Sequence, residues 1–255
     1  MNASPASPAP VFAARHLIKR FGGLTATDDL SLALQRGRIL ALIGPNGAGK
    51  TTALAQLSGE LRPDAGQILF QGRDITRLNM AQRAKAGIAR SFQITAIFEQ
   101  FSVLENVCLA VQAAARHHFR FWGRAMRDQA LLEPAQAALQ RVALQPLAER
   151  PASALAHGQK RQLEIAMALA TAPQVLLLDE PLAGMGRAEA EVIVALLAEL
   201  RAEHAILLVE HDMNAVFQLA DTVVVLDDGA ILAQGPAAAI RANPAVQAAY
   251  LSEGD

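Results

Sequence analysis

The stretch Arg38-Ile-Leu-Ala-Leu-Ile-Gly-Pro-Asn-Gly-Ala-Gly-Lys-Thr-Thr52 decides the fold of this 255-residue chain. Its first part, Arg38–Ile43, is a compact apolar run of the kind that forms a buried strand. Glycines follow at once, and the run from Thr51 to Leu57 is compatible with a helix. A buried strand, a glycine-rich loop and a helix in direct succession indicate an α/β fold.

The glycine-rich loop fits the pattern G-x-x-x-x-G-K-[ST]. Glycines let backbone N–H groups turn inward around phosphate oxygens, and the helix N-terminus adds its positive dipole end. Lys50 is predicted to reach the β- and γ-phosphates, and Thr51 to give its hydroxyl to Mg²⁺. An ordinary glycine-rich turn is disfavoured by the strand before the loop and the helix after it. The predicted nucleotide-binding residues here are Gly44, Pro45, Asn46, Gly47, Ala48, Gly49, Lys50, Thr51 and Thr52.

A second apolar run, Val175-Leu-Leu-Leu-Asp-Glu180, ends in two adjacent carboxylates. A buried strand presents a Mg²⁺-holding aspartate in this way, so Asp179 is predicted to bind the metal directly or through water. Glu180 is predicted to orient or deprotonate the attacking water. Taken alone, an acidic strand end is often only the start of a solvated loop. Its pairing with the phosphate loop favours the catalytic interpretation.

The rest of the chain alternates between β-type and helical segments. Short strands are expected over residues 11–43, a turn at Pro63–Gly66, and helices between about residues 94 and 151, where Ala, Leu, Gln and Arg dominate. A later strand–helix–strand pattern is typical of a parallel sheet. Its parts are Val175–Leu178, Arg187–Glu203 and Ile206–Val209, and a hairpin with the turn Asp227-Asp228-Gly229 follows.

Composition excludes several classes of protein. The 23 Lys and Arg against 24 Asp and Glu argue against a nucleic-acid binder that relies on bulk positive charge. The single cysteine, Cys108, excludes an internal disulfide framework and a Cys-rich zinc site, and its apolar surroundings predict a buried thiol. Residues 1–10 lack the features of a secretory signal and are expected to form a disordered tail. The apolar runs fall short of the roughly 18 residues of a membrane span, so any membrane role is expected to come through a partner.

Four further features, in order along the chain, make it resemble the ATP-binding subunit of an ABC transporter. Phe21 stands where that family has an aromatic that stacks on adenine, and Gln93 matches the Q-loop glutamine. Leu155-Ala-His-Gly-Gln159, with a helix expected from Lys160, matches the signature motif, and His211 matches the switch histidine. Alone, each would be more simply explained as a core aromatic or an ordinary loop residue. Their order carries the resemblance.

The resemblance implies a P-loop NTPase core of the RecA-like type, with an antiparallel β subdomain and an inserted α-helical subdomain. It places the ATPase domain over residues 11–255, with the core at about 11–94 and 160–235, the helical insert at about 95–159, and C-terminal helices at about 236–255. It implies ATP and Mg²⁺ as ligands and assigns roles residue by residue. The catalytic set is Glu180, His211, Gln93 and Lys50, the metal set is Thr51, Gln93 and Asp179, and the remaining nucleotide contacts are Phe21, Leu155, Ala156, His157, Gly158 and Gln159.

Within the family, the chain looks most like the branched-chain amino acid importers, with urea-type importers close behind. The segments that carry this likeness are Lys19–Gly23, Arg90–Gln93, Val103–Val107, Asp179–Met185 and Val246–Leu251. The likeness implies a MgATP-hydrolysing subunit on the cytoplasmic face of the inner membrane. Its implied partners are transmembrane permease subunits, a second ATP-binding subunit that is identical or different, and, indirectly, a periplasmic binding protein. A soluble non-transport ABC ATPase and a non-hydrolysing ATP-binding regulatory module are the alternatives.

Two departures from the family pattern stand out. Ala156 and His157 occupy positions where the signature normally has Ser and Gly, and Gly186 occupies the acid or amide position of the D-loop. In the family, the signature serine donates a hydrogen bond to the γ-phosphate across the interface, and Ala156 cannot. Loss of one hydrogen bond to a charged group costs roughly 1.5–3 kcal/mol. If the second ATPase has an intact signature, we expect the site formed by Lys50 and Glu180 to hydrolyse well and the partner's own site to be weaker. Phe98, Phe101, Val103 and Leu104 are candidates for lining a groove for the membrane partner, with burial in the core as the rival explanation.

Overall fold

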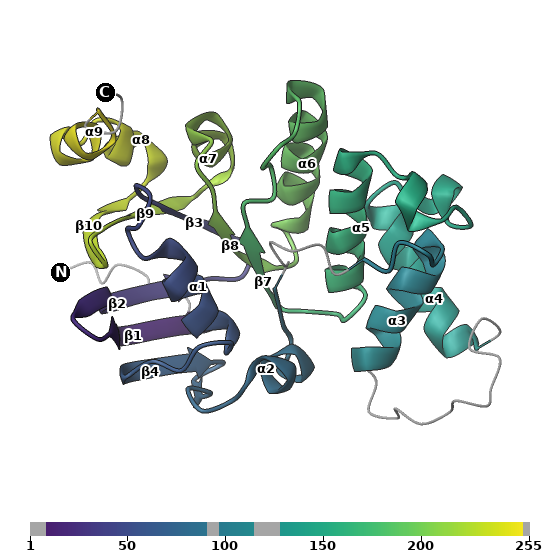
Figure 1. The fold of residues 1–255 in the computed structure, drawn as a ribbon, viewed down its shortest axis with the longest axis horizontal. Helices are drawn as coiled ribbons and strands as arrows, with labels where there is room; N and C mark the ends of the chain where they lie inside the picture. Colours follow the sequence, from purple (N-terminus) through teal and green to yellow (C-terminus); the bar gives the residue numbers. More distant parts are fainter. Residues whose placement is uncertain (1–8, 91–96, 115–127, 252–255) are drawn as a thin grey trace, which may run out of the picture.

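A computed structural model describes residues 9–90, 97–114 and 128–251 of the chain (Figure 1). The strands are β1 Phe12–Phe21, β2 Leu24–Leu34, β3 Ile39–Ile43, β4 Ala65–Phe70, β5 Arg73–Asp74, β6 Ile88–Arg90, β7 Val175–Asp179, β8 Ala205–Val209, β9 Thr222–Asp227 and β10 Ala230–Gly235. The α-helices are α1 Lys50–Ser58, α2 Met80–Ala86, α3 Val103–Ala114, α4 Gln129–Arg141, α5 His157–Leu169, α6 Arg187–Leu200, α7 Met213–Leu219, α8 Ala237–Arg241 and α9 Pro244–Leu251.

The central feature is a six-stranded sheet with the order β10-β9-β3-β8-β7-β6. Strands β3, β7 and β8 are buried along their whole length and pair in parallel through β8. Parallel strands covered on both faces are continuously apolar, which explains why the sequence marks these three so clearly. Because the carboxyl ends of parallel strands meet at one edge, the residues after β3, β7 and β8 are brought to the same edge of the sheet.

A second sheet, antiparallel with the order β2-β1-β4-β5, lies beside the first (Figure 1). Phe12, Leu30 and Ile68 of this sheet share one buried cluster with Leu42 of β3 and Leu54 of α1. Helix α1 is therefore held by apolar packing against elements of both sheets. The predicted turn at Pro63–Gly66 is too long, because Ala65 and Gly66 already belong to β4.

Helices α3, α4 and α5 form the end of the molecule farthest from the antiparallel sheet (Figure 1). Val107, Leu139 and Leu163, one from each helix, lie in a single buried cluster that also includes Leu178 of β7 and Ile193 of α6. The helices predicted between residues 94 and 151 are confirmed at Val103–Ala114 and Gln129–Arg141. The helix predicted from Lys160 begins earlier, at His157, because the Gln159 side chain accepts a hydrogen bond from the Ala156 N–H at 3.0 Å.

The predicted hairpin joins β9 and β10. Asp228 and Gly229 have φ of 44° and 81°, the left-handed backbone at both positions that a tight hairpin turn requires. The Gly229 N–H donates to the Ala48 carbonyl at 3.2 Å, and the Gly229 carbonyl accepts from the Asp28 N–H at 2.8 Å. The turn therefore lies directly against the glycine-rich loop and joins it to β2.

Arg83 of α2 is almost completely buried and is held by backbone carbonyls rather than by a carboxylate. Its Nη1 donates to the carbonyls of Gln56 and Leu57 at the end of α1, both at 2.8 Å. Its Nη2 and Nε donate to the carbonyls of Ile75, Thr76 and Leu78. Burial lowers the pKa of Arg83 to about 10. The guanidinium thus ties the end of α1 to the segment that leads into α2.

We expect Arg83→Met to lower the free energy of unfolding by about 3 kcal/mol, because buried carbonyls lose charged donors that methionine cannot replace. Urea unfolding at neutral pH measures this. Arg187→Met is the matched control, since the Arg187 side chain is exposed and forms a surface ion pair with Glu191, and we expect it to change stability by less than about 0.5 kcal/mol. Equal effects of the two substitutions would show that the carbonyl clamp contributes no stability of its own.

Over the described ranges, no helix combines the length and the apolar character needed to cross a membrane.

Candidate functional site

The glycine-rich loop connects β3 to α1 and is shaped by close backbone contacts. Gly44 and Gly49 have φ of 151° and 97°. A Cβ atom at Gly44 would lie 2.2 Å from the Leu226 carbonyl oxygen, and one at Gly49 would lie 2.2 Å from the Ala26 carbonyl oxygen. Gly47 also has a positive φ, of 84°, but a Cβ there would meet nothing within 4 Å. The loop therefore needs glycine for contact at two positions and for backbone conformation at three.

Lys50 starts α1 and turns back over the loop. Its ammonium Nζ donates to the carbonyls of Gly44 at 2.5 Å and Pro45 at 2.7 Å. Thr51, the next residue, lies exposed in the first turn of α1, and the N-cap residue Gly49 offers no side chain to that turn. The loop thus gathers an ammonium group, a hydroxyl and the positive end of a helix, which is the donor set that holds phosphate groups in proteins.

Asp179 is the last residue of β7 and is almost fully buried. Its Oδ2 accepts a hydrogen bond from Arg90 Nη2 at 3.2 Å. Burial raises the pKa of the Asp179 carboxyl, and the hydrogen bond and charge of Arg90 oppose that rise. The sequence analysis used Arg90 only as part of the family likeness and gave it no role at the site, because it lies in the short strand β6, far from Asp179 along the chain.

Glu180 follows Asp179 with an unusual backbone conformation, φ of 45°. Its N–H donates to the Val209 carbonyl at 2.9 Å, and its carbonyl accepts from Arg161 Nη2 at 3.1 Å. The residue is fixed from both sides, by β8 and by α5. Left-handed backbone at a non-glycine residue is uncommon and concentrates at functional sites. Glu180 is partly exposed and directly follows the end of β7, and its catalytic role stays a prediction.

Glu210, directly after β8, is a buried carboxylate that the sequence analysis missed. It accepts hydrogen bonds from the N–H groups of Leu182 at 2.8 Å and His211 at 3.1 Å. Burial raises the pKa of Glu210, and these bonds oppose the rise. His211 itself is exposed, with its ring Nδ1 3.9 Å from Glu210 Oε2. Glu210 therefore braces the segments that carry His211 and follow Glu180. A carboxylate directly after an apolar strand was the signal that could have revealed it.

The signature segment, residues 155–159, lies at the start of α5. Gly158 is buried against α6, and a Cβ atom there would lie 3.2 Å from the side chain of Glu189. A Cβ at Gly184 would lie 3.6 Å from the His157 ring, so His157 neighbours the segment that follows Glu180. In Figure 1, α5 and α1 lie on either side of β7. The structure thus joins the signature segment to α6 rather than to the glycine-rich loop of the same chain.

Of the other predicted site residues, Phe21 is described by the structure and Gln93 is not. Phe21 ends β1, is half exposed, and has Lys19 Nζ 5.5 Å from its ring centre. An exposed ring with a cation beside it is able to stack on a planar base. Gln93 lies outside the described residues, so its predicted role stays a prediction.

The residues present fit a nucleotide with Mg²⁺. The described residues contain no cluster of three or more His, Cys, Asp or Glu side chains that could hold a metal alone. Mg²⁺ typically takes one or two protein oxygens together with substrate phosphates, so a full protein cage is not required. The Asp179 carboxylate and the Thr51 hydroxyl provide hard oxygen donors of this kind.

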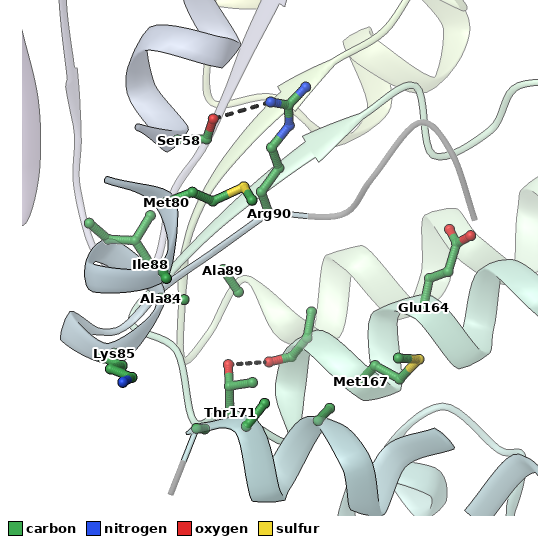
Figure 2. A pocket seen from close by; sticks show the side chains of 15 residues that line it. Ser58, Met80, Ala84, Lys85, Ile88, Ala89, Arg90, Glu164, Met167 and Thr171 are labelled. Atoms are coloured by element: carbon green, nitrogen blue, oxygen red, sulfur yellow. Dashed lines mark hydrogen bonds between the residues drawn. The ribbon is translucent and has the colours of Figure 1, made fainter. Parts of the chain in front are cut away.

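A cavity of about 310 Å³ lies between α2, β6, α3 and α5 (Figure 2). Its wall is mainly apolar, and Figure 2 shows Arg90 and Ser58 at one end and Thr171 and Lys85 at the other. Phe98, Phe101, Val103 and Leu104, the residues predicted to line a groove, are not among its lining residues. Val103 and Leu104 are buried in the core, whereas Phe98 and Phe101 are exposed and stack with ring centres 5.5 Å apart. The labelled lining residues are Ser58, Met80, Ala84, Lys85, Ile88, Ala89, Arg90, Glu164, Met167 and Thr171.

Fold and loop together define a P-loop nucleotide-binding domain, and comparison with known proteins specifies it further. The sequence profile described as "ABC transporter" matches residues 27–183, and the profile "Branched-chain amino acid ATP-binding cassette transporter" matches residues 230–251. The chain is 39% identical over 251 residues to the "High-affinity branched-chain amino acid transport ATP-binding protein BraF" of Pseudomonas aeruginosa, covering 96% of this chain and 98% of that protein. It is 40% identical over 253 residues to the protein of the same description, LivG, of Escherichia coli K12, with the same coverage.

Solved structures agree with the sequence comparisons. The ADP conformation of MJ1267, "an ATP-binding cassette of an ABC transporter", superposes with a TM-score of 0.86 at 28% identity, covering 96% of this chain and 99% of that one. A nucleotide-free ATP-binding cassette of an ABC transporter superposes equally well, with 94% and 98% coverage. The chain belongs to the ATP-binding subunits of ABC transporters. It is accordingly a nucleotide-binding ATPase of the P-loop class.

Proposed function

We propose that this chain hydrolyses MgATP to drive an ABC importer for branched-chain amino acids. Two findings support this proposal: the chain is similar to BraF and LivG over nearly its full length, and residues 230–251 match the profile of branched-chain amino acid ATP-binding cassette transporters. The observation that supports the hydrolytic part is that β3, which leads into the loop before Lys50, and β7, which ends at Asp179, run parallel in the six-stranded sheet and end at the same edge. The subunit would sit on the cytoplasmic face of the inner membrane.

Each site residue has a physical role in the proposed reaction. The Lys50 ammonium and the loop N–H groups would hold the β- and γ-phosphates, and Phe21 would stack on the adenine. Water attacks the γ-phosphorus as the bond to the bridging oxygen of ADP breaks, and the Glu180 carboxylate orients this water and accepts its proton. Asp179 and Thr51 would hold Mg²⁺, which supplies charge neutralisation at the phosphate oxygens when bound. His211 would contact the γ-phosphate, and Gln93 would contact Mg²⁺ and the attacking water.

A second ATP-binding subunit would complete each nucleotide site. A γ-phosphate held from one side cannot draw two domains together, whereas donors at the N-terminus of α5 in an opposing subunit would close its shell. Ala156 cannot donate the side-chain hydrogen bond of the usual serine. We therefore propose a different ATPase with an intact signature as the partner. The site at Lys50 and Glu180 would then be the more active of the two.

The permease subunits would dock at the cavity between α2, β6, α3 and α5. The cavity is apolar, with Lys85 and Glu164 among its lining residues, which suits a short amphipathic helix. It also lies next to Arg90, the residue that contacts Asp179. Docking there would place the membrane partner next to Arg90, which bonds the proposed metal ligand Asp179. A periplasmic binding protein would contact the permease and not this chain.

The substrate proposal is tested by transport in proteoliposomes. The chain would be reconstituted with its permease subunits, its ATPase partner and its binding protein, with ATP sealed on the ATPase side. We expect saturable accumulation of labelled leucine that excess isoleucine or valine inhibits and urea does not. The same assembly carrying Glu180→Gln is the matched control and should lose most of the uptake. Accumulation of urea without leucine would overturn the assignment to branched-chain amino acids.

A further inference from the structure

Arg90 contacts the last residue of α1 and the last residue of β7, two elements that have separate roles in the proposed function. Its side chain is about nine-tenths buried at the end of β6. Nη2 donates to Asp179 Oδ2 at 3.2 Å. Nη1 donates to Ser58 Oγ at 3.1 Å and to Glu60 Oε2. Ser58 is the last residue of α1, the helix that begins with Lys50, so one guanidinium joins the phosphate-binding helix to the strand end that carries Asp179.

The same residue forms part of the cavity wall. Ile88, Ala89 and Arg90, the whole of β6, line the cavity, and Ser58 lines it too. β6 pairs in parallel with β7, with Arg90 opposite Leu177, and it is the edge strand of the sheet. Figure 2 shows the Arg90 side chain extending away from the apolar part of the cavity toward Ser58. An occupant pressing on β6 would therefore move a residue that is bonded to Asp179.

The contact between Arg90 and Asp179 is shielded from solvent. Asp179 is almost fully buried, and the Arg90 side chain is about nine-tenths buried. Of the two carboxylates on Arg90, Glu60 is largely exposed and solvated, whereas Asp179 is not. Arg90 Nε is buried without a hydrogen-bond partner among the described residues, so the guanidinium holds fewer bonds than it is able to make. The bonds that it does make connect the Asp179 carboxylate to the end of α1.

We infer that Arg90 is a positioning residue that links the cavity to the hydrolytic site. It orients the Asp179 carboxylate and the end of α1, and it carries a displacement of β6 to them. The inference rests on the proposed function, because it takes Asp179 as part of the hydrolytic site. It adds a residue outside the set of nucleotide-contacting side chains, and it connects the cavity wall to Asp179 through Arg90.

The first experiment compares Arg90→Gln, Arg90→Lys and Arg141→Gln in the full-length chain. Arg141 also pairs with a glutamate, Glu203, but on the exposed surface, so it is the matched control. We expect Arg90→Gln to lower kcat for MgATP about 10- to 100-fold, the usual effect of removing a group that orients a metal ligand. Affinity for a fluorescent ATP analogue in EDTA should stay within about twofold, since Arg90 bonds Asp179 and the last residue of α1, whereas the phosphate loop lies at the other end of that helix. Arg90→Lys should recover part of kcat, because it keeps the charge but not the planar fork.

The second experiment fills the cavity with a probe. Ala84→Cys lines the cavity, and Ala238→Cys on α8 is an exposed control site. The sole native cysteine, Cys108, is buried with its pKa raised to about 11, so the parent chain should resist labelling. We expect N-phenylmaleimide at position 84 to change kcat at least about threefold when Arg90 is present and much less in Arg90→Gln or Arg90→Lys. The label at position 238 should change nothing.

The outcomes separate this inference from the proposed function. If the unlabelled parent chain and its complexes fail to hydrolyse MgATP, the proposed function fails. If they hydrolyse MgATP and Arg90→Gln matches the parent in kcat, the positioning role is wrong while the proposed function stands. If the label at position 84 acts equally with and without Arg90, the link through this residue is wrong. Should Arg90→Gln fail to fold, the same comparison is made with Arg90→Lys.

Discussion

Glu180→Gln is expected to lower MgATP turnover by at least about 100-fold while ATP binding is retained. Glutamine keeps the size and hydrogen-bonding reach of the side chain but cannot accept the proton of the attacking water. The backbone of residue 180 is held by Val209 and Arg161, so the substitution should leave the fold unchanged. Phosphate release by the working dimer at saturating MgATP measures the effect.

The matched control for this substitution is Glu191→Gln. Glu191 lies exposed on α6 and forms a surface ion pair with Arg187, so turnover should stay at the parent level. In a dimer with a different ATPase, Glu180→Gln should remove most of the total activity, since the proposed active site is the one on this chain. Retention of most of the turnover would show that Glu180 does not activate the water.

Gly49→Ala should damage both folding and nucleotide binding far more than Gly47→Ala. Both residues have φ in the left-handed region, so each substitution costs about 1 kcal/mol of backbone strain. Only at Gly49 does the new Cβ meet a backbone atom, the Ala26 carbonyl oxygen at 2.2 Å. Because β2 must then move away from the start of α1, we expect a further loss of 1–3 kcal/mol, of the order that overpacking costs.

Thermal unfolding and ATP titration of the two glycine variants measure this difference. The pair is closely matched, since the two positions lie in the same loop, two residues apart in the sequence, and receive the same methyl group. Gly47→Ala should lower Tm only slightly and bind ATP nearly as well as the parent. Equal losses in the two variants would mean that backbone conformation alone, and not the approach of β2, sets the requirement for glycine at Gly49.

The parts of the fold that the sequence predicts are those with strong local signals. The strands β3, β7 and β8 are recognisable in the sequence because buried parallel strands are continuously apolar. The loop at residues 44–52 is recognisable because its glycines and Lys50 are fixed by phosphate chemistry. The turn at Asp228–Gly229 follows from the backbone conformation that a tight hairpin requires.

Other features depend on contacts between distant segments, and the sequence leaves them hidden. Arg90 and Arg83 look like ordinary surface arginines until the fold brings Asp179 and the end of α1 beside them. The start of α5 was misplaced because Ala156 carries no capping side chain to mark it. Val103 and Phe98 are both apolar, yet Val103 at the start of α3 is buried and Phe98, in the segment before it, is exposed, a difference that depends on tertiary packing.

The most direct test of the account is equilibrium binding of ATP to the purified chain in the presence of Mg²⁺, compared between the parent, Lys50→Ala and Lys85→Ala. The Lys50 ammonium lies over the phosphate loop, whereas Lys85 lies exposed beside the cavity. We predict saturable one-site binding by the parent and by Lys85→Ala, and a loss of affinity of at least about tenfold in Lys50→Ala, the effect of removing a charge-assisted bond to phosphate. Absence of binding to the parent, or equal affinity in Lys50→Ala, would contradict the claim that this loop holds the nucleotide.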